Sequence, residues 1–306
     1  MSLFPPPEVV KTEVFASVPE RYRKKNVVTH WVETHRNGAP TDCFLEGPSF
    51  DRAGNLYVTD IPFGRIFRIS PAGEFDLVAE YDGEPNGLKI HKDGRIFITD
   101  HKRGILLLDP ASGKVTPFLE RRHTEGFKGV NDLVFGMNGD IYFTDQGQTG
   151  LHDPSGRVLR LTPAGKLETL MQNVPSPNGL VLNPAENILY VAVTRGNAIW
   201  RLPLLSDGTT SKVGVFIYLS GGIGPDGIAM DESGGLAVSH VGMGVVWIFN
   251  NKGIPKLKLE SCRGDMVTNL AYGGPRRQTL FIVESPSGAI LTAEVPVAGR
   301  IMYSHM

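Results

Sequence analysis

The chain has 306 residues, of which 41% are hydrophobic, so it is long enough to bury a large core within one domain. Its 31 basic and 32 acidic side chains nearly cancel, which argues against nucleic acid or an anionic membrane as the main partner. No apolar run reaches the roughly 18 residues that a membrane span needs, and Met1–Pro7 lacks the basic and apolar regions of a signal peptide. We therefore expect a soluble cytoplasmic protein, with Cys43 and Cys262 as free thiols in a reducing compartment.

Residues 1–45 stand outside the pattern that organises the rest of the chain. Within them, Thr12–Pro19 is predicted to be a strand, because β-branched and aromatic residues are spread through it. An irregular segment follows over residues 20–45, and its basic run Arg21–Lys25 is interpreted as a solvated face. This segment directly precedes the first repeat, which begins at Glu46, so we consider it a candidate lid over a site at that position.

From Glu46 onward one arrangement recurs six times. Each copy contains a short motif with a central acid or amide, an apolar run, a Gly-containing or polar turn, and a second apolar run. The central residues are Glu46, Asn86, Asn131, Asn178, Asp226 and Asn269. They follow one another at steps of 40, 45, 47, 48 and 43 residues, a spacing typical of a β-propeller.

The runs within each copy indicate strands. Short β-branched and aromatic runs joined by turns such as Asp93-Gly94 and Asn138-Gly139 predict hairpins, a third run appears in every copy, and a fourth follows in the first five. The sequence therefore predicts an all-β fold, a six-bladed β-propeller with four strands per blade over residues 46–295, within one domain spanning 1–306. The sixth copy lacks a fourth strand, so we expect Thr12–Pro19 to close the last blade and remove an open sheet edge.

Chain direction around a four-stranded blade sorts the loops onto two faces. The loop that enters each first strand carries the central acid or amide, and the loop that leaves each second strand lies on the same face. These second loops contain six further polar candidates: His101, Arg103, Gln146, Gln148, Arg195 and His240. Around a closed ring, the acids and amides are therefore expected to converge on one mouth of the central axis.

A metal ion is the expected occupant of that mouth. Each Pro-Asn-Gly or Pro-Asp-Gly motif alone is a common turn, but six acids and amides in register would lack partners unless water or a cation lay among them. Oxygen donors without His or Cys favour a hard divalent ion, Ca²⁺ first and then Mg²⁺ or Mn²⁺. Four of the six are expected to be ligands: Glu46, Asn131, Asn178 and Asp226. We expect Asn86 and Asn269 to lie beside or behind them.

Other chemistries are weighed against this one. Gly222–Gly227 matches the spacing of a dinucleotide-binding turn, but a strand rather than a helix follows it, so that function is rejected. The chain has neither a GxSxG nucleophile elbow nor an HExxH zinc helix. Among the histidines, His101 and His240 fall on the expected site face, where they either contact substrate or pack the loops.

The motifs resemble those of the senescence marker protein/gluconolactonase family, which includes luciferin-regenerating enzymes. The resemblance covers nearly all of residues 44–295 and rests on five stretches in order: LEGPSFD, GVNDLVF, SPNGLVL, GPDGIAM and TNLAYGG. It implies a six-bladed propeller with one divalent metal held by Glu46, Asn131, Asn178 and Asp226. Two positions depart from branches of the family. Gly129 stands where sugar-lactone members often carry Arg, and Ser285 stands where the organophosphatase-like branch carries His.

These observations lead us to expect metal-assisted hydrolysis of a lactone of the gluconolactonase type. The metal, Ca²⁺ or otherwise Mg²⁺, Mn²⁺, Zn²⁺ or Fe²⁺, would polarise the carbonyl, and Asp226 would act as the general base toward water. We expect eight residues to contact substrate: Asn86, His101, Arg103, Gln146, Gln148, Arg195, His240 and Asn269. The alternatives are organophosphate hydrolysis at the same metal site, and a non-catalytic calcium-binding propeller.

Overall fold

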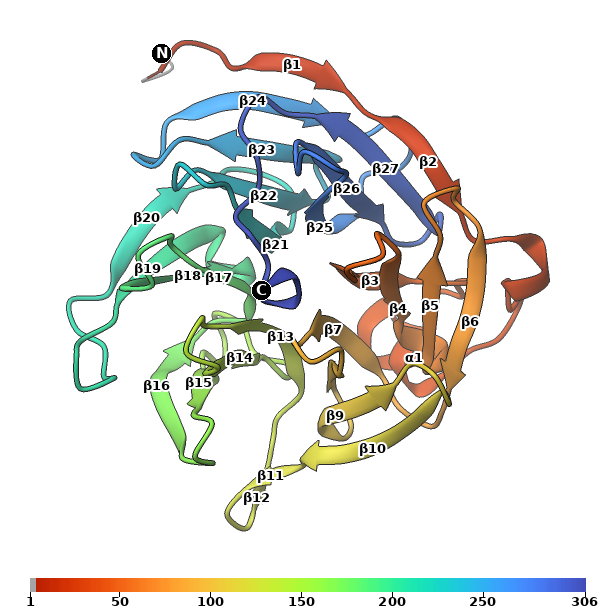
Figure 1. The fold of residues 1–306 in the computed structure, drawn as a ribbon, viewed down its shortest axis with the longest axis horizontal. Helices are drawn as coiled ribbons and strands as arrows, with labels where there is room; N and C mark the ends of the chain where they lie inside the picture. Colours follow the sequence, from red (N-terminus) through yellow and green to blue (C-terminus); the bar gives the residue numbers. More distant parts are fainter. Residues whose placement is uncertain (1–3) are drawn as a thin grey trace.

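A computed structural model describes residues 4–306; Met1–Leu3, part of the stretch inspected for a signal peptide, lie outside the described residues. Six antiparallel sheets stand like blades around a central axis (Figure 1), so the predicted six-bladed propeller is confirmed. In each blade the first strand lies at the hub and later strands lie progressively outward. Apolar side chains fill the spaces between neighbouring blades, where for example Phe97 of blade 2 packs with Phe135 of blade 3.

Each blade has the four strands that its hairpin signals predict. The first three blades comprise β3 (Leu45–Phe50), β4 (Leu56–Asp60), β5 (Arg65–Ile69) and β6 (Phe75–Glu80); β7 (Pro85–Ile90), β8 (Ile96–Asp100), β9 (Gly104–Asp109) and β10 (Lys114–Leu119); and β13 (Val130–Phe135), β14 (Ile141–Asp145), β15 (Gly156–Leu161) and β16 (Leu167–Val174). A small hairpin, β11 (Arg121–Arg122) with β12 (Glu125–Gly126), projects between blades 2 and 3.

The remaining blades follow the same order, with N-terminal strands added at the outside. They comprise β17 (Pro177–Leu182), β18 (Ile188–Val193), β19 (Ala198–Pro203) and β20 (Gly214–Tyr218); β21 (Gly224–Met230), β22 (Leu236–Val241), β23 (Val245–Phe249) and β24 (Pro255–Glu260); and β25 (Val267–Gly273), β26 (Thr279–Glu284), β27 (Ala289–Glu294) and β2 (Glu13–Ser17). Short 3₁₀ turns lie at η1 (Glu20–Tyr22), η2 (Ile61–Phe63), η3 (Thr194–Gly196) and η4 (Tyr303–His305).

The N-terminal strands close the ring. β2 pairs antiparallel with β27, with Glu13 opposite Thr292, which confirms that this stretch completes the last blade. The preceding strand β1 (Glu8–Lys11) was not predicted; it lies parallel to β24 and gives blade 5 a fifth strand. One continuous stretch of chain thus joins the outer edges of blades 5 and 6, which stabilises the point of closure.

A ring of side-chain hydroxyls joins each blade to the next near the hub. At the end of the second strand, a Thr or Ser hydroxyl donates to a backbone carbonyl at the start of the next blade's first strand. The pairs are Thr59 to Asn86, Thr99 to Asn131, Thr144 to Asn178, Thr194 to Pro225, Ser239 to Thr268, and Ser285 to Leu45. These buried bonds fix the relative heights of the six first strands, and therefore the positions of the side chains that those strands carry.

Residues 20–45 are more ordered than the sequence indicated. The expectation of an irregular segment is wrong for residues 30–36, which form the helix α1 (His30–Arg36). The Thr29 hydroxyl accepts from the Val32 N–H at its start, and Asn37 ends it in a left-handed conformation. A helix of two turns is too short to show a clear hydrophobic period, so tertiary contacts rather than pattern specify it.

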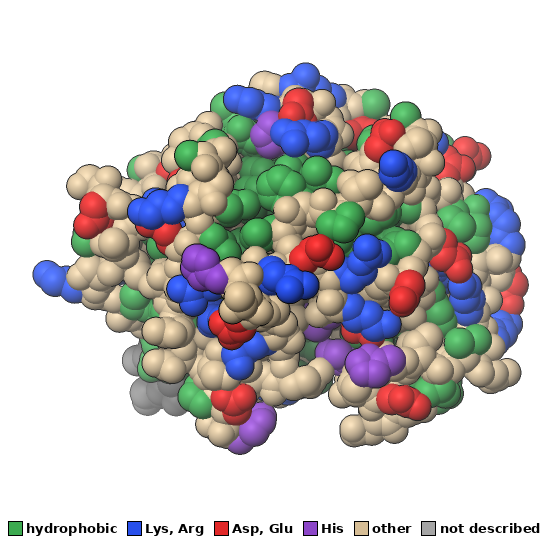
Figure 2. All heavy atoms as spheres, turned by 90° about the horizontal axis from the view of Figure 1, so that it is seen from below, with side chains coloured by type: hydrophobic (Ala, Val, Ile, Leu, Met, Phe, Trp, Pro, Cys, Tyr) green, Lys and Arg blue, Asp and Glu red, His purple; other side chains and the backbone are tan. Residues whose placement is uncertain are grey.

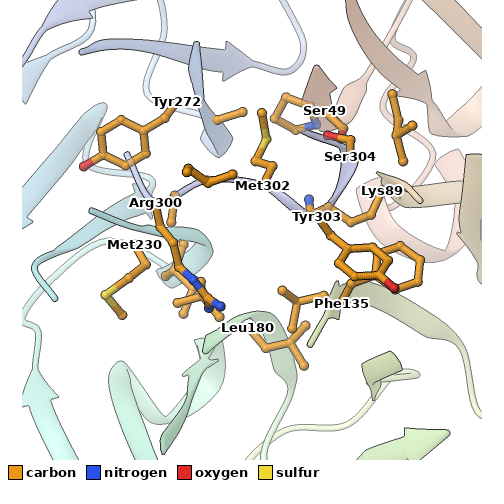
Figure 3. Close-up of a pocket in the computed structure, with 18 of the residues that line it drawn as sticks. Ser49, Lys89, Phe135, Leu180, Met230, Tyr272, Arg300, Met302, Tyr303 and Ser304 are labelled. Atoms are coloured by element: carbon orange, nitrogen blue, oxygen red, sulfur yellow. The ribbon is translucent and has the colours of Figure 1, made fainter. Parts of the chain in front are cut away.

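The two ends of the hub differ in polarity. At one end the first strands present the acids and amides; at the other they present apolar residues, which the C-terminal segment Arg300–Ser304 covers. Tyr303 of this segment stacks on Phe135 (Figure 3). The Ser304 hydroxyl donates to the Phe50 carbonyl. The C-terminal segment therefore closes the hub on the side opposite the predicted site.

Two surface properties follow the composition. Side chains of both charge signs are interspersed over the face shown in Figure 2, in keeping with the near-zero net charge. Within residues 4–306, no helix has the length and apolar character that crossing a membrane requires.

Candidate metal centre

The strand register brings the predicted acids and amides to one level of the hub. In blades 2 to 5 the central residue directly follows the last paired residue before a bulge in the first strand. These pairs are Pro85–Asp100, Val130–Asp145, Pro177–Val193 and Pro225–His240. In blade 1 the central residue Glu46 follows the Leu45–Asp60 pair and is itself the last paired residue, opposite Thr59. In blade 6 the corresponding pair is Val267–Glu284, so Thr268 rather than Asn269 is level with the other five. Asn269 lies one residue farther along, a correction to the predicted register.

Glu46 is the most deeply enclosed acid of the ring, with 3% of its surface exposed. Its Oε2 accepts from the Gly47 N–H at 2.8 Å and from Asn269 Nδ2 at 2.7 Å, and the Thr268 side chain also hydrogen-bonds it. Burial nevertheless raises the pKa of Glu46 to about 7, and the negative charge of Asp132 adds to the effect. Three neutral donors therefore hold the carboxylate in place.

Asp226 is the second acid, and part of its surface reaches the mouth of the ring. Desolvation of its carboxylate raises the pKa of Asp226 well above its usual range, and the negative charges of Glu46 and Asp132 raise it further. A hydrogen bond from Asn178 and the charge of Arg195 act in the opposite direction. Glu46 and Asp226 therefore lie close enough to oppose each other's ionisation, as the convergence of blades 1 and 5 predicts.

The amide of Asn131 supplies a test of whether this centre fits a metal. Its Nδ2 donates to Gln146 Oε1 at 2.8 Å, which turns the carbonyl oxygen away from Gln146. That Oδ1 is buried and has no hydrogen-bond partner among the residues that the structure describes. An orphaned carbonyl oxygen beside buried carboxylates fits a hard divalent cation, which prefers oxygen ligands and would satisfy the oxygen and offset the charge.

The sequence analysis missed a third acid, Asp132. Its side chain is buried next to Asn131, its Oδ1 accepts from the Leu133 N–H at 2.7 Å, and Lys89 Nζ lies 3.8 Å away. In four blades the equivalent position after the central residue is Gly, and only blades 3 and 6 carry a polar side chain there, Asp132 and Asn269. This departure from the repeat was the signal that could have identified Asp132.

The candidate ligands differ from those of a metal centre made only of His, Cys, Asp or Glu, because half of them are neutral amides. Within residues 4–306, no group of three or more His, Cys, Asp or Glu side chains has an arrangement suited to a metal. The candidate centre instead combines the carboxylates of Glu46 and Asp226 with the amide oxygens of Asn131 and Asn178. Such a donor set suits Ca²⁺ better than it suits Zn²⁺, which prefers nitrogen and sulfur.

The loops after the second strands lie on the same face as the ring, as predicted. In each blade a backbone hydrogen bond joins the loop that leaves the second strand to the loop that enters the first strand. Examples are the bonds from the His101 N–H to the Glu84 carbonyl and from the Gln146 N–H to the Gly129 carbonyl. Gln146 bridges Asn131 and the Ser176 hydroxyl, so it orients a ring residue. Gln148 is exposed at the mouth, and its Nε2 lies 2.8 Å from Nε2 of His35 in α1.

The two predicted arginines differ in position. Arg195 is exposed, and its charge lowers the pKa of Asp226, so it lies near the ring. Arg103 lies over the ring of Tyr81 at 6.0 Å, where the aromatic face engages its guanidinium. Asn86 is buried at the level of the ring, while Asn269 supports Glu46 from behind, as expected.

The two predicted histidines also differ. His240 is buried with both nitrogens engaged, because Nδ1 accepts from Trp247 Nε1 at 3.2 Å and Nε2 donates to the Gly221 carbonyl at 3.0 Å. Its observed contacts are those of a loop-packing residue. Both ring nitrogens of His101, in contrast, are buried and have no hydrogen-bond partner in the described part of the chain.

Both departures from the family pattern have structural counterparts. Gly129 has φ +151°, and a Cβ at this position would lie 2.9 Å from His101 Cδ2, so a larger residue would displace the imidazole. The Ser285 hydroxyl donates to the Leu45 carbonyl as a member of the hydroxyl ring. Ser285 therefore holds blade 6 against blade 1.

The fold and the site together define a six-bladed propeller with a ring of buried acids and amides at one mouth of its hub. The family model described as the SMP-30/gluconolactonase/LRE-like region matches residues 44–285, and the chain belongs to this family. It is 34% identical over 237 residues to the lactonase drp35 of Staphylococcus aureus (strain MRSA252), covering 74% of this chain and 71% of that protein. It is 33% identical over 238 residues to the lactonase drp35 of Staphylococcus epidermidis, covering 74% and 70%.

Solved structures share the same fold. The gluconolactonase XC5397 of Xanthomonas campestris superposes with a TM-score of 0.74 at 24% identity, covering 93% of this chain and 98% of that one. A calcium-binding regucalcin of Agrobacterium tumefaciens superposes with a TM-score of 0.76 at 20% identity, covering 98% and 99%. At these identities the likeness concerns the fold alone.

Proposed function

We propose that the protein is a metal-dependent lactonase, in which residues of the acid–amide ring hold one divalent cation and a water molecule opens the lactone. The observation that carries the proposal is the buried, unpartnered Asn131 Oδ1 in a ring that also holds Glu46 and Asp226, two acids whose pKa values are both raised. The lactonase activity named for the staphylococcal relatives supports the reaction class. The family of the chain supports a gluconolactonase-like substrate.

Four side chains would hold the metal: Glu46, Asn131, Asn178 and Asp226. When bound, a divalent cation supplies Lewis-acid polarisation of a carbonyl oxygen, worth several kcal/mol of charge stabilisation in the transition state. Ca²⁺ fits this oxygen donor set best, with Mg²⁺ and Mn²⁺ next and Zn²⁺ or Fe²⁺ as further alternatives.

Asp226 is assigned as the general base. It is the acid of the ring with surface at the mouth, so water can approach it, while Glu46 is enclosed by its hydrogen-bond donors. A carboxylate whose pKa is raised is a stronger base toward water than an ordinary Asp side chain. Asp226 takes the proton of the attacking water, and Glu46 provides charge and fixed geometry.

The surrounding loops bind the substrate and the product. Arg195 is placed to attract the carboxylate that ring opening generates, because its charge already acts on Asp226. Gln146 holds the amide of Asn131 and so fixes the direction of its carbonyl. Gln148 lies at the rim between blade 3 and α1, where it bounds the space available to the substrate.

A turnover panel tests this function. Pure protein is treated with chelator, reloaded with Ca²⁺, Mg²⁺ or Mn²⁺, and assayed with aldonolactones and simple lactones by pH indicator, and with a phosphotriester for comparison. We expect lactone turnover that chelator abolishes and metal restores. Preferential phosphotriester hydrolysis would reassign the substrate class, and metal binding without any turnover would make the protein a non-catalytic binder.

A further inference from the structure

The helix α1 covers part of the mouth and reaches across it. At one side of the helix, Trp31 and Val32 pack against Phe44, Ile61 and Met266, which belong to the loops of blades 1 and 6. Its other end carries His35, whose Nε2 meets Gln148 of blade 3 at 2.8 Å. The ring of His35 also lies edge-on to the ring of His101 of blade 2, with centroids 5.4 Å apart at 85°. Four blades are thus connected through one short helix.

His35 itself is fully engaged. Its ring stacks on Trp31 at 5.1 Å with an interplanar angle of 12°, Nδ1 lies 2.9 Å from the Thr34 hydroxyl, and Nε2 lies against Gln148. The imidazole therefore has a fixed orientation. What it covers is the imidazole of His101.

His101 presents the opposite case. Its two ring nitrogens are buried, and neither has a hydrogen-bond partner within residues 4–306. His240, which is also buried, has both nitrogens satisfied by Trp247 and Gly221. Burial lowers the pKa of His101 to about 3, so its imidazole is neutral at physiological pH, with one N–H donor and one acceptor nitrogen. Two buried polar atoms on one imidazole call for a hydrogen-bond partner that residues 4–306 do not supply.

His101 lies next to the candidate metal centre. His101 directly follows Asp100, which pairs with Pro85, the neighbour of Asn86 in the ring. On its other side it lies against Gly129, two residues before Asn131. The imidazole therefore lies just outside the acid–amide ring, between the loops of blades 2 and 3 and beneath α1.

We propose that His101 is a specificity-determining residue whose imidazole, covered by His35, hydrogen-bonds a hydroxyl group of the lactone substrate. The inference rests on the proposed lactonase function and deepens it by naming the substrate substituent that His101 recognises. A hydroxyl group both donates and accepts, which matches the donor and the acceptor of a neutral imidazole, whereas a carboxylate only accepts. His35 is a positioning residue, because its ring packs edge-on against the imidazole of His101 and holds it in place.

The test compares two six-membered lactones, the hydroxylated glucono-1,5-lactone and the unsubstituted δ-valerolactone. His101→Phe keeps the aromatic volume but removes both polar atoms, and His101→Asn restores a donor and an acceptor. His305→Phe, at an exposed histidine of η4 on the opposite end of the hub, is the matched control. For His101→Phe we expect kcat/KM for gluconolactone to fall about 10–100-fold, mainly through KM, with little change for δ-valerolactone. We expect His101→Asn to recover part of the loss, and His305→Phe to resemble the parent.

Two results would overturn the inference. An equal loss for both lactones in His101→Phe would mean that the imidazole only supports the loop, and unchanged kinetics for both would mean that it contacts no substrate hydroxyl. For His35→Ala, a loss confined to gluconolactone supports the positioning role, and an equal loss for both lactones contradicts it.

A binding measurement separates this inference from the proposed function. Calorimetry with gluconolactam and δ-valerolactam, which keep the ring but resist hydrolysis, does not require turnover. If the parent opens no lactone, the proposed function fails. A selective loss of gluconolactam binding in His101→Phe would still support the hydroxyl subsite, and equal binding of both lactams by parent and variant would overturn it.

Discussion

The two ends of the hub are built from the same six strands but have opposite chemistry. At the start of each first strand lie the acids and amides of the ring, while later residues of the same strands, such as Leu180 and Ile228, line an apolar space at the other end. The C-terminal segment covers that second end, with Met302 and Tyr303 pointing into it (Figure 3). The geometry of the fold therefore does not require polar side chains at the hub.

The two ends also differ in what they contribute to stability. An apolar hub gains stability from burial, whereas carboxylates taken out of water lose solvation and oppose one another. Glu46, Asp132 and Asp226 thus make the acid–amide end less stable than an apolar equivalent would be. We infer that a cation bound at this end would offset the cost, and the variants below change one end at a time.

The largest expected effect belongs to Asp226→Asn. Asparagine keeps an oxygen ligand and nearly the same volume but cannot accept a proton from water, so kcat should fall about 10²–10⁴-fold. Lactone turnover under saturating metal measures this loss, and a calcium titration serves as the control, since the cation should still bind. Turnover equal to that of the parent would remove Asp226 from the mechanism.

A smaller effect is expected from Asn269→Ala, which leaves all four proposed ligands intact. The Asn269 amide donates to Glu46 Oε2, so its removal frees the carboxylate from one of its orienting partners. Loss of such a supporting bond typically weakens metal affinity about 10–100-fold. Calorimetric titration with Ca²⁺ measures the change. An unaltered affinity would indicate that Glu46 is not a ligand.

The pKa of Glu46 gives a prediction with a definite sign. Because its folded-state pKa is raised to about 7, the protonated acid favours the folded protein at low pH, and this contribution is lost as pH rises through about 7. Buried histidines such as His101, whose pKa is lowered, act in the opposite direction over this range, so the parent is compared with Glu46→Gln. Without metal, the melting temperature of the parent relative to that of Glu46→Gln should be lower at pH 8 than at pH 6. Metal affinity of the parent should fall below pH 7 as the ligand takes up a proton. Thermal unfolding with and without metal measures both trends, and the same pH dependence in metal-free parent and variant would contradict the assignment.

The smallest effect on catalysis is expected at the apolar end. Tyr303→Ala removes a buried ring that stacks on Phe135, which should lower the free energy of unfolding by about 3 kcal/mol. Metal affinity and kcat should remain close to the parent values, because the acid–amide ring is untouched. Denaturant unfolding and lactone turnover provide the two readouts. A large loss of metal affinity would show that the two ends are coupled.

Most of the architecture could be predicted from the sequence, because each blade repeats its own turn and strand signals. The closing role of residues 12–19 also followed, since the sixth copy lacks a fourth strand. In contrast, β1 could not be assigned, because a four-residue edge strand carries no local information about which strand it will join. The helix α1 was missed for a similar reason: its seven residues are held by Trp31 and Val32 packing rather than by a periodic pattern.

The site was predicted at the level of the ring but not of its details. Glu46 and Asp226 interact as the repeat implies, yet the position of Asn269 one residue beyond the ring depends on a bulge that the spacing of the motifs does not reveal. Asp132 was visible only as a departure from glycine at its position. The His35–His101 contact joins residues 66 positions apart through a helix that the sequence did not indicate.

Whether the acid–amide ring holds a divalent cation can be seen by anomalous diffraction from crystals grown with Mn²⁺. We expect one strong anomalous peak within coordination distance of oxygen atoms of Glu46, Asn131, Asn178 and Asp226, absent from crystals of Glu46→Gln. A ring occupied only by water in the parent protein, with Asn131 Oδ1 hydrogen-bonded to that water and manganese bound elsewhere, would refute the proposed metal centre.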